Sequence, residues 1–354
     1  MEISPLFPPA ELTGFVNRIL EELPINDHKG EQFFPNAFTG SDSWTTGLQS
    51  ARDFTSEAEY RAWNTESSVG ERPGLFRISG NIVPISRKIP LNEEMIRLLK
   101  NARTMGVPDI VRTQVFNDAE ALIRMVRNRV ERARWEVVDK ATFTIGNPGG
   151  ATYPATEHGL QMQVDYLRDS GNRFAVATKW DQPSADPLSD ELDLIQSAAD
   201  AGKDLAGGVM VASLATIIAL CKNDAYRRAY ASFREFDRLT PGQLNTVRNE
   251  WGLPSIVRMD AKSKRRLASN TDSNVAMADP KRAYFLPSNQ VGQTLWGPSS
   301  YVGEDAIGMT GSNGGPIIFF AKTVDPLTYW TVIDAPVIPV LFQPNDTYSV
   351  QVLT

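Results

Sequence analysis

The sequence predicts an α+β protein, and the distribution of its apolar residues indicates this class. Helical spacing of apolar residues dominates the middle of the chain, whereas the part after about residue 283 consists of short apolar runs typical of strands. The 354 residues, 42% of them apolar, suffice for two or three domains at roughly 150 residues each. With 22% charged and 9% aromatic residues, the composition excludes a chain that is disordered throughout.

The N-terminal part combines a short helix with a long irregular segment. Apolar residues follow helical spacing until Pro24 ends the pattern: Leu12, Phe15, Val16, Ile19, Leu20 and Leu23. From Ile25 to about Pro90 the spacing fades, yet aromatic residues recur among Gly, Pro, Ser and Thr: Phe33, Phe34, Phe38, Trp44, Phe54, Tyr60, Trp63 and Phe76. We interpret this segment as one that buries its aromatics on neighbouring subunits, and the alternative is a loop folded back on its own domain. Arg77 to Ile89 predicts a strand pair or an extended loop, with Pro84 at an edge or a bend.

The longest predicted helix covers residues 117–138, with Asn117 as its N-cap. Its apolar stripe consists of Ala119, Ile123, Val126, Val130, Ala133 and Val137. Opposite charges at i, i+4 spacing predict ion pairs between Glu120 and Arg124, Arg127 and Glu131, and Arg132 and Glu136. These pairs neutralise the arginines, so we expect a solvated or intersubunit face rather than a nucleic-acid footprint. Trp135 lies on the polar side and indicates a second contact surface.

The second half of the chain predicts a mixture of strands and helices. Helices are expected after Ser189, from Ser213 to about Glu235, and after a capping box formed by Thr240 and Gln243 with Pro241 between them. Lys262 to Asp279 reads as a solvated loop. Strands are expected at 142–145, 160–166, 208–212, 255–259, 283–286, 317–321, 329–333, 337–342 and 348–353. The uncharged stretch from Leu205 to Cys221 is thus read as a buried strand and a helix rather than a membrane span.

Composition and motifs exclude several kinds of site. The net charge of -6 argues against a dedicated nucleic-acid reader, and the single Cys221 allows no intrachain disulfide and no Cys/His zinc site. We find no phosphate-binding loop, HExxH, GxSxG or EF-hand pattern, and we expect no secretory signal at Met1 to Leu20. One alternative remains, a cytoplasmic hydrolase that uses His158 as general base with an acidic partner. We expect no enzyme, no cofactor, no metal and no membrane contact.

Several segments resemble one family, the major capsid protein of lambda-type tailed phages, known as the capsid E family. The resemblance lies near the N-terminus in Leu12, Thr13, Asn17, Leu23, Pro24 and Phe38, and in mid-chain in Val164, Asp165, Tyr166, Arg168, Trp180, Asp186 and Pro187. It is most specific late in the chain, in Tyr284 to Pro287 (YFLP), in Gly292 to Pro298 (GQTLWGP) and in Asp325 to Thr354. It departs between about Gly40 and Val83 and at Lys262 to Asp279.

The resemblance implies the Hong Kong 97-type capsid fold. It implies an N-terminal arm at 1–40, an extended loop at 41–90, a peripheral domain at 91–180 with a spine helix at 117–138, an axial domain at 181–305, and strands at 306–354 that return to the peripheral domain. The expected function is structural: self-assembly into pentamers and hexamers of an icosahedral phage head around double-stranded DNA. A nanocompartment shell of the same fold is the alternative within this fold.

The same resemblance sets the expected partners and contacts. Besides other copies of the chain we expect a scaffolding protein, a portal, a decoration protein and packaged DNA bound without sequence specificity. The location is the virion, with assembly in the host cytoplasm. Side chains expected at intersubunit contacts are Phe15, Phe33, Phe34, Trp44, Trp63, Arg87, Lys88, Arg124, Arg127 and Trp135.

Overall fold

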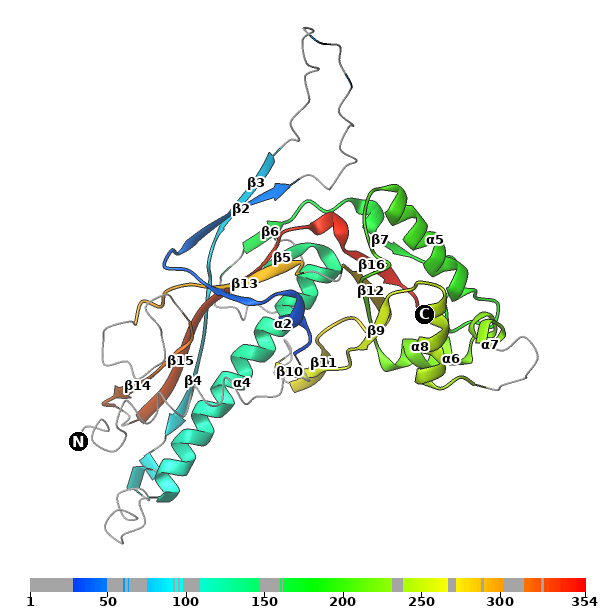
Figure 1. Ribbon diagram of the computed structural model, residues 1–354. Helices are drawn as coiled ribbons and strands as arrows, with labels where there is room; N and C mark the ends of the chain where they lie inside the picture. Colours follow the sequence, from blue (N-terminus) through cyan, green and yellow to red (C-terminus); the bar gives the residue numbers. More distant parts are fainter. Residues whose placement is uncertain are drawn as a thin grey trace. The chain divides into compact units, whose positions relative to one another are not determined.

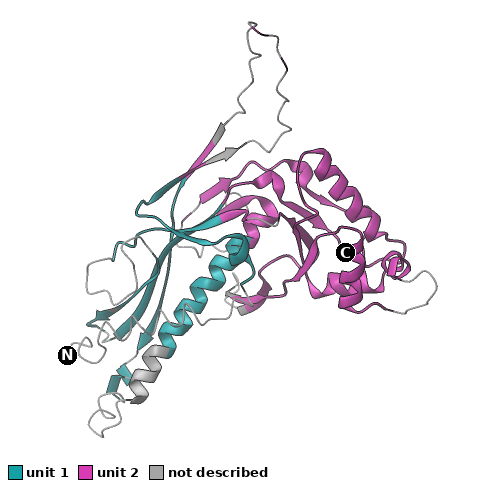
Figure 2. Cartoon of the chain, viewed as in Figure 1, with its two compact units in different colours: residues 1–44, 80–134, 293–340 teal, residues 45–79, 135–292, 341–354 magenta. Residues whose placement is uncertain are grey.

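The computed structural model forms two compact units (Figures 1 and 2). Unit 1 comprises residues 1–44, 80–134 and 293–340, and unit 2 comprises residues 45–79, 135–292 and 341–354. The residues whose structure is described are 28–49, 60, 63, 75–91, 93–94, 96–97, 109–146, 160, 162–230, 238–266, 272–287, 290–301, 315–325 and 328–354.

Unit 1 is a sheet packed against a long helix. The sheet has the order β1-β13-β15-β14, and β4 also pairs with β15. Its strands are β1 (Asn36–Phe38), β4 (Pro84–Leu91), β13 (Gly292–Trp296), β14 (Ile317–Thr323) and β15 (Thr328–Leu341). Apolar residues of helix α4 (Asp109–Lys140), among them Leu122 and Val126, join Ile318 and Ile333 of the sheet in one buried cluster. The predicted apolar stripe is therefore the face that meets the sheet.

Helix α4 contains the predicted range 117–138 but begins earlier, at Asp109. Asn117 therefore lies inside the helix, and its prediction as the N-cap was wrong. Asn in a helix interior costs only a fraction of a kcal/mol, about 0.7 at most, and tertiary packing overrides so weak a preference. The residues of α4 from Trp135 onward belong to unit 2.

Strand β15 joins two stretches that the sequence predicts as separate strands. Proline lacks the N–H donor of a strand residue but keeps its carbonyl acceptor. In β15 the carbonyl of Pro336 accepts a hydrogen bond from Gly297 N at 2.9 Å, and the next residue, Val337, donates to Val83 O at 3.0 Å. The strand thus continues through Pro336 because neighbouring segments bind the Pro336 carbonyl and the N–H of the next residue.

The segment from 25 to 90 is more regular than the sequence suggests. It contains α2 (Gly30–Phe33), β1, β2 (Ser43–Gln49), β3 (Leu75–Asn81) and β4. Both halves of Arg77 to Ile89 are strands, but β3 pairs with β2 while β4 pairs with β15. Short alternating runs indicate strands, whereas their partners depend on segments far away in the sequence.

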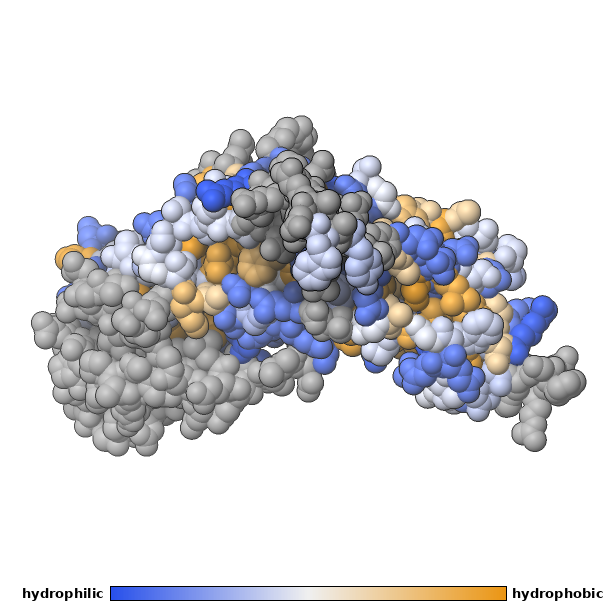
Figure 3. Space-filling model, turned by 45° about the horizontal axis from the view of Figure 1, so that its top comes forward, coloured by the Kyte–Doolittle hydropathy of each residue, from blue (hydrophilic) through white to orange (hydrophobic). Residues whose placement is uncertain are grey.

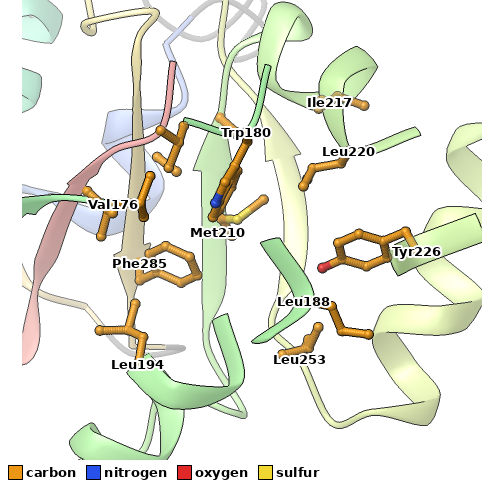
Figure 4. Close-up of a cluster of buried hydrophobic side chains, with 14 of the residues drawn as sticks. Val176, Trp180, Leu188, Leu194, Met210, Ile217, Leu220, Tyr226, Leu253 and Phe285 are labelled. Atoms are coloured by element: carbon orange, nitrogen blue, oxygen red, sulfur yellow. The ribbon is translucent and has the colours of Figure 1, made fainter. Parts of the chain in front are cut away.

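In its described residues, unit 2 contains a five-stranded sheet and, besides the end of α4, four α-helices. The strand order is β7-β16-β12-β8-β9, with antiparallel pairs at β12 and parallel pairs at both edges. The strands are β7 (Arg173–Ala175), β8 (Val209–Ala212), β9 (Ser255–Arg258), β12 (Arg282–Leu286) and β16 (Tyr348–Gln351). The helices are α5 (Pro187–Asp200), α6 (Leu214–Lys222), α7 (Asp224–Tyr230) and α8 (Pro241–Glu250). Figure 4 shows their shared core, in which Trp180, Met210, Phe285 and Tyr226 converge.

Helix caps explain where the helices of unit 2 begin. Ser213 caps α6 by accepting from Thr216 N, and Thr240 forms the predicted capping box with Gln243. For α5 the N-cap is Asp186 rather than the predicted Ser189, because the Asp186 carboxylate accepts from Ser189 N and Pro187 occupies the first helical position. The single helix predicted after Ser213 is two helices divided at Asn223, whose side chain binds Ala225 N at 2.9 Å.

Two-stranded antiparallel sheets also belong to unit 2. Strands β5 (Thr142–Ile145) and β6 (Met162–Asp165) form one antiparallel pair. Lys262 to Asp279, predicted as a solvated loop, contains a second pair, β10 (Lys262–Arg266) and β11 (Asp272–Ala276). Its charged residues conceal the strand pattern, and among the residues there whose burial is described only Ser263 and Met277 are buried. Among the described residues, no helix has the length and apolar character that a bilayer crossing requires.

Candidate assembly interface

A buried ion pair fastens the N-terminal segment of unit 1 to α4. Glu131 accepts a hydrogen bond from Gly30 N at 2.6 Å, and its other oxygen lies 3.1 Å from Arg134 Nη1. Arg134 also donates to Asn36 Oδ1 at 3.0 Å and to Thr294 Oγ1 at 2.8 Å. One acid and one arginine of α4 thus hold α2, β1 and β13 in place.

The environment of this pair is the core of unit 1, whereas the sequence predicts a solvated or intersubunit face for these charges. Glu131 is 0% and Arg134 4% exposed. Burial lowers the pKa of Arg134, and the charge of Glu131 opposes this effect. A Cβ atom at Gly30 would lie 2.9 Å from the Glu131 carboxylate, so a larger residue there would have to displace that carboxylate.

A pocket of about 160 Å³ lies beside the pair in unit 1. Its lining is apolar along α4 and the sheet, with Ile123, Val126 and Ile333, and polar at Arg127 and Glu31. Arg127 pairs with Glu31 at 3.2 Å, so this arginine also binds the N-terminal segment.

Strand β4 carries two of the predicted contact residues. Arg87 and Lys88 are exposed, and the Lys88 ammonium lies 4.2 Å from the centre of the Trp330 ring. Prolines at 84 and 90 and the two charges are features that discourage uncontrolled pairing of an edge strand.

The other predicted contact residues fall into two groups. Phe33, Phe34 and Trp44 are buried within unit 1, and Trp135 packs on Tyr284 at a ring distance of 5.7 Å. Their side chains have almost no surface left for a neighbouring subunit. For these residues the structure matches the alternative, in which the aromatics pack within their own subunit.

The remaining residues of the set keep exposed surface or lie outside the described residues. Trp63 is 95% exposed, and Arg124 is paired with Glu120 at 2.6 Å, as predicted, with most of its side chain in solvent. Phe15 lies outside the described residues. The role of the set in contacts between subunits stays a prediction.

Sequence reasoning missed several exposed apolar side chains. Figure 3 shows apolar side chains reaching the surface of unit 2 among hydrophilic ones. The exposed large apolar residues of this unit include Phe174, Leu214, Ile218 and Trp251, each more than a third exposed. The i, i+4 spacing of Leu214 and Ile218 places both side chains on one face of α6, and this spacing is the signal in the sequence that could have found them.

The residues of the family motif in mid-chain serve the fold. Arg168 donates to Val138 O at 2.7 Å and also to Asp139 O, so it closes the carbonyl end of α4. Burial lowers the pKa of Arg168 to about 10. Tyr166, fully buried, donates its N–H to Ala141 O at 2.9 Å.

The residues considered for catalysis have no catalytic surroundings that the structure describes. His158 lies outside the described residues, and His28 Nε2 lies 3.1 Å from Asn128 Oδ1. Cys221 is buried, and this burial raises the pKa of its thiol, which keeps it in the unreactive form. Within the described ranges, no group of His, Cys, Asp and Glu is arranged to hold a metal ion.

Comparison with known proteins identifies the family. The family model for phage major capsid protein E matches residues 16–352. No curated protein matches the chain. A putative prophage capsid protein from Escherichia coli is similar in structure, with a TM-score of 0.57, 14% identity, and coverage of 96% of this chain and 98% of that one. A phage-related protein from Bordetella bronchiseptica has a TM-score of 0.52, 13% identity, and coverage of 95% of each chain.

These findings agree with the α+β architecture and with the predicted Hong Kong 97-type fold. At this level of identity the structural likeness establishes the fold, while the family match over nearly the whole chain establishes the function. The function is structural, that of a major capsid protein. The chain belongs to the phage major capsid protein E family.

Proposed function

We propose that copies of this chain join through an arm at 1–40, an extended loop at 41–90 and the spine helix α4, and so build the pentamers and hexamers of an icosahedral head around double-stranded DNA. The observation that carries the proposal is the exposure of Tyr60 and Trp63, which are 106% and 95% exposed. Aromatic rings of this size normally find cover, and both residues belong to the proposed extended loop. Cover from a neighbouring copy accounts for them.

Many weak contacts suffice for such a shell. Each subunit meets several neighbours at once, and simultaneous contacts multiply modest affinities. Edge strand β4, with Arg87 and Lys88 exposed, and helix α4, with Arg124 exposed, offer further polar contacts.

The finer assignments belong to the same proposal. A scaffolding protein, a portal and a decoration protein are the partners besides other copies, and assembly takes place in the host cytoplasm. The net charge of -6 supports a container for DNA, because strong attraction to the phosphate backbone would impede movement of DNA during packaging. The role is structural, without enzymatic activity, and the division into arm, loop, peripheral and axial parts is part of the proposal.

Negative-stain electron microscopy and light scattering of the purified chain test the proposal. We expect capsomers or closed shells at high protein concentration. A monomer of 39.1 kDa under every scaffold and salt condition would contradict it.

A double substitution tests the exposed rings. Tyr60→Ser with Trp63→Ser should leave the thermal unfolding curve unchanged and lower the yield of shells, because neither ring has a covered surface to lose in the folded subunit. Val324→Ser is the control, since Val324 is 81% exposed and belongs to no predicted contact. Equal yields for both variants would argue against the loop contact.

The arm requires a deletion that spares the core. Residues 30–38 form α2 and β1, and Phe33 and Phe34 are buried, so removing 1–40 would damage unit 1 itself. Deleting residues 1–27 should instead keep cooperative unfolding and abolish shells. Normal shells from this variant would refute the role of the arm.

A further inference from the structure

The β10–β11 hairpin of unit 2 carries a run of basic residues. Four of the five residues of β10 are basic, in the order KSKRR. Lys262 and Lys264 lie two residues apart and therefore on one face of the hairpin, opposite Ala276 and Asn274. Within the described part of the chain, neither lysine lies at ion-pair distance from a carboxylate, and Lys262 acts on Asp260 only through its charge, as one of the causes that lower the pKa of Asp260.

The outer face of α5 is the acidic counterpart within the same unit. Asp186, Asp193 and Asp200 are exposed and follow helical spacing, and α5 contains no basic residue. The three carboxylates form no ion pair among the described residues; Asp186 caps the helix, and Asp200 accepts from Gln196 Nε2 at 2.8 Å. Burial, and after it the charges of Asp186 and Asp193, raises the pKa of Asp190. The carboxylates on this face of α5 thus repel one another, and no basic side chain of the described residues pairs with Asp186, Asp193 or Asp200.

One of these charges is unfavourable where it stands. Asp200 is the last residue of α5, and no basic residue occupies the last turn. The carbonyl end of a helix carries partial negative charge, so a carboxylate there destabilises the helix. Asp200 thus departs from the preference for basic residues in the last turn of a helix, and no basic group among the described residues of the subunit compensates for it. Such departures are typical of residues that serve a functional contact.

The two faces have no means of neutralising each other within one chain. Figure 1 shows α5 and the β10–β11 hairpin on opposite sides of unit 2. Complementary patches on opposite sides of a subunit form head-to-tail contacts, and these close into rings when the rotation allows it.

We propose that the β10–β11 hairpin of one copy docks on the outer face of α5 of a second copy. The inference rests on the proposed function, because it assigns a contact to the rings of subunits that build the shell. Packaged DNA would also attract Lys262 and Lys264, but it would leave the aspartates of α5 unpaired. A second copy accounts for both surfaces with one contact.

Reversal of charge in the full-length protein tests the contact. Lys262→Glu with Lys264→Glu, and separately Asp193→Lys with Asp200→Lys, should each lower the assembled fraction about tenfold at about 0.1 M salt, where exposed charges are screened beyond about 10 Å. The four substitutions together should restore assembly to within about threefold of the unchanged protein, because the pair is then re-formed with opposite signs.

Matched controls separate this contact from general effects of charge and folding. Lys281→Glu and Glu250→Lys make the same kinds of change at other exposed positions of unit 2 and should assemble normally. In the α5 variant, Asp200→Lys places a cation at the carbonyl end of the helix, so the melting temperature measured by circular dichroism should stay unchanged or rise. If the α5 variant then fails to assemble, the failure is not caused by a loss of fold.

The outcomes are distinct. The proposal would be overturned if the variant with all four substitutions assembled as poorly as the hairpin variant or the α5 variant alone. So would hairpin variants that form normal shells and retain less DNA, because the hairpin would then face the genome. If the unchanged protein formed no assembly at all, the proposed function itself would fail, and this contact with it.

Discussion

Each compact unit buries an arginine–glutamate pair, and the two pairs connect different kinds of segment. In unit 2 Arg248 of α8 and Glu191 of α5 are both fully buried and lie 2.6 Å apart. The Tyr226 hydroxyl of α7 donates to Glu191 Oε1 at 2.9 Å. In unit 1 the pair of Glu131 and Arg134 lies within α4 and holds segments far away in the sequence.

The two pairs therefore have different roles: the pair in unit 2 stabilises a domain, and the pair in unit 1 positions the N-terminal segment. The unit 2 pair joins helices of one continuous stretch, residues 187–250, so it stabilises a domain that the surrounding chain builds locally. Burial acts to lower the pKa of Arg248, but the charge of Glu191 together with Tyr226 and the hydrogen bonds to both raises it, so the guanidinium stays ionised. The unit 1 pair instead fixes where the chain after residue 28 runs along α4, which sets the starting point of the proposed arm.

The largest expected effect follows from breaking the pair in unit 2. Arg248→Met leaves Glu191 buried without its charge partner, and such changes cost about 3–5 kcal/mol. Urea unfolding followed by tryptophan fluorescence measures it, because Trp180 lies in the same core. Arg248→Met with Glu191→Leu should recover part of the loss, since replacing both charges removes the unpaired carboxylate. A double variant no more stable than the single one would contradict this account.

A smaller effect is expected from Glu131→Gln in unit 1. The neutral amide weakens the bonds to Gly30 N and to Arg134, and hydrogen bonds to charged groups contribute about 1.5–3 kcal/mol. Arg134 retains its bonds to Asn36 and Thr294, so the sheet and helix stay packed.

Limited proteolysis distinguishes this local effect from global unfolding. Trypsin should cleave faster after Lys29 in the Glu131→Gln variant, while the thermal midpoint of unit 2 stays unchanged. Unaltered cleavage at Lys29 would show that the pair does not hold the N-terminal segment.

Alkaline pH should weaken unit 2 through Tyr226. Burial and the nearby Glu191 charge raise the pKa of Tyr226 well above its ordinary value of 10.0. Above pH 10 the unfolded chain releases this proton while the folded chain keeps it, so the free energy of unfolding falls by about 1.4 kcal/mol per pH unit. Unfolding titrations between pH 9 and about 11 measure the slope. Tyr226→Phe should show a shallower slope, and an equal slope would assign the effect to other groups.

The smallest effect is expected at the exposed pair on α4. Glu120→Gln removes the ion pair with Arg124, which lies largely in solvent, and such helix pairs contribute about 0.3–0.5 kcal/mol. The free energy of unfolding obtained from thermal melts should fall by no more than this amount, and only at low salt. A loss as large as that of Glu131→Gln would mean that burial does not distinguish the two acids.

The sequence predicts those parts of the fold whose causes are local. The capping box at Thr240 and the N-cap at Ser213 involve groups three residues apart, and the apolar stripe of α4 repeats along one helix. Most late strands were predicted because apolar runs bounded by turn residues suffice to indicate them, although β13, the fusion of two predicted strands into β15 and the pairing were not. The family motifs also identified the capsid family, which the match over residues 16–352 confirms.

Of the residues that sequence reasoning assigned to subunit contacts, Trp63, Arg87, Lys88 and Arg124 are exposed in the structure, whereas Phe33 and Phe34 are buried within unit 1. A run of aromatics shows that cover is needed and does not show which surface supplies it. In the same way, the basic run at 262–266 reads as solvated whether or not it pairs into a hairpin.

Only the tertiary structure decided the burial of Glu131. By itself the sequence determined that residues 117–138 form an amphipathic helix with charges at i, i+4 spacing, because that follows from periodicity along one segment. That Glu131 leaves the solvent to bind the backbone of Gly30 depends on a contact across 101 positions of sequence. No local pattern encodes such a contact, since it exists only when sheet and helix have brought the two segments together.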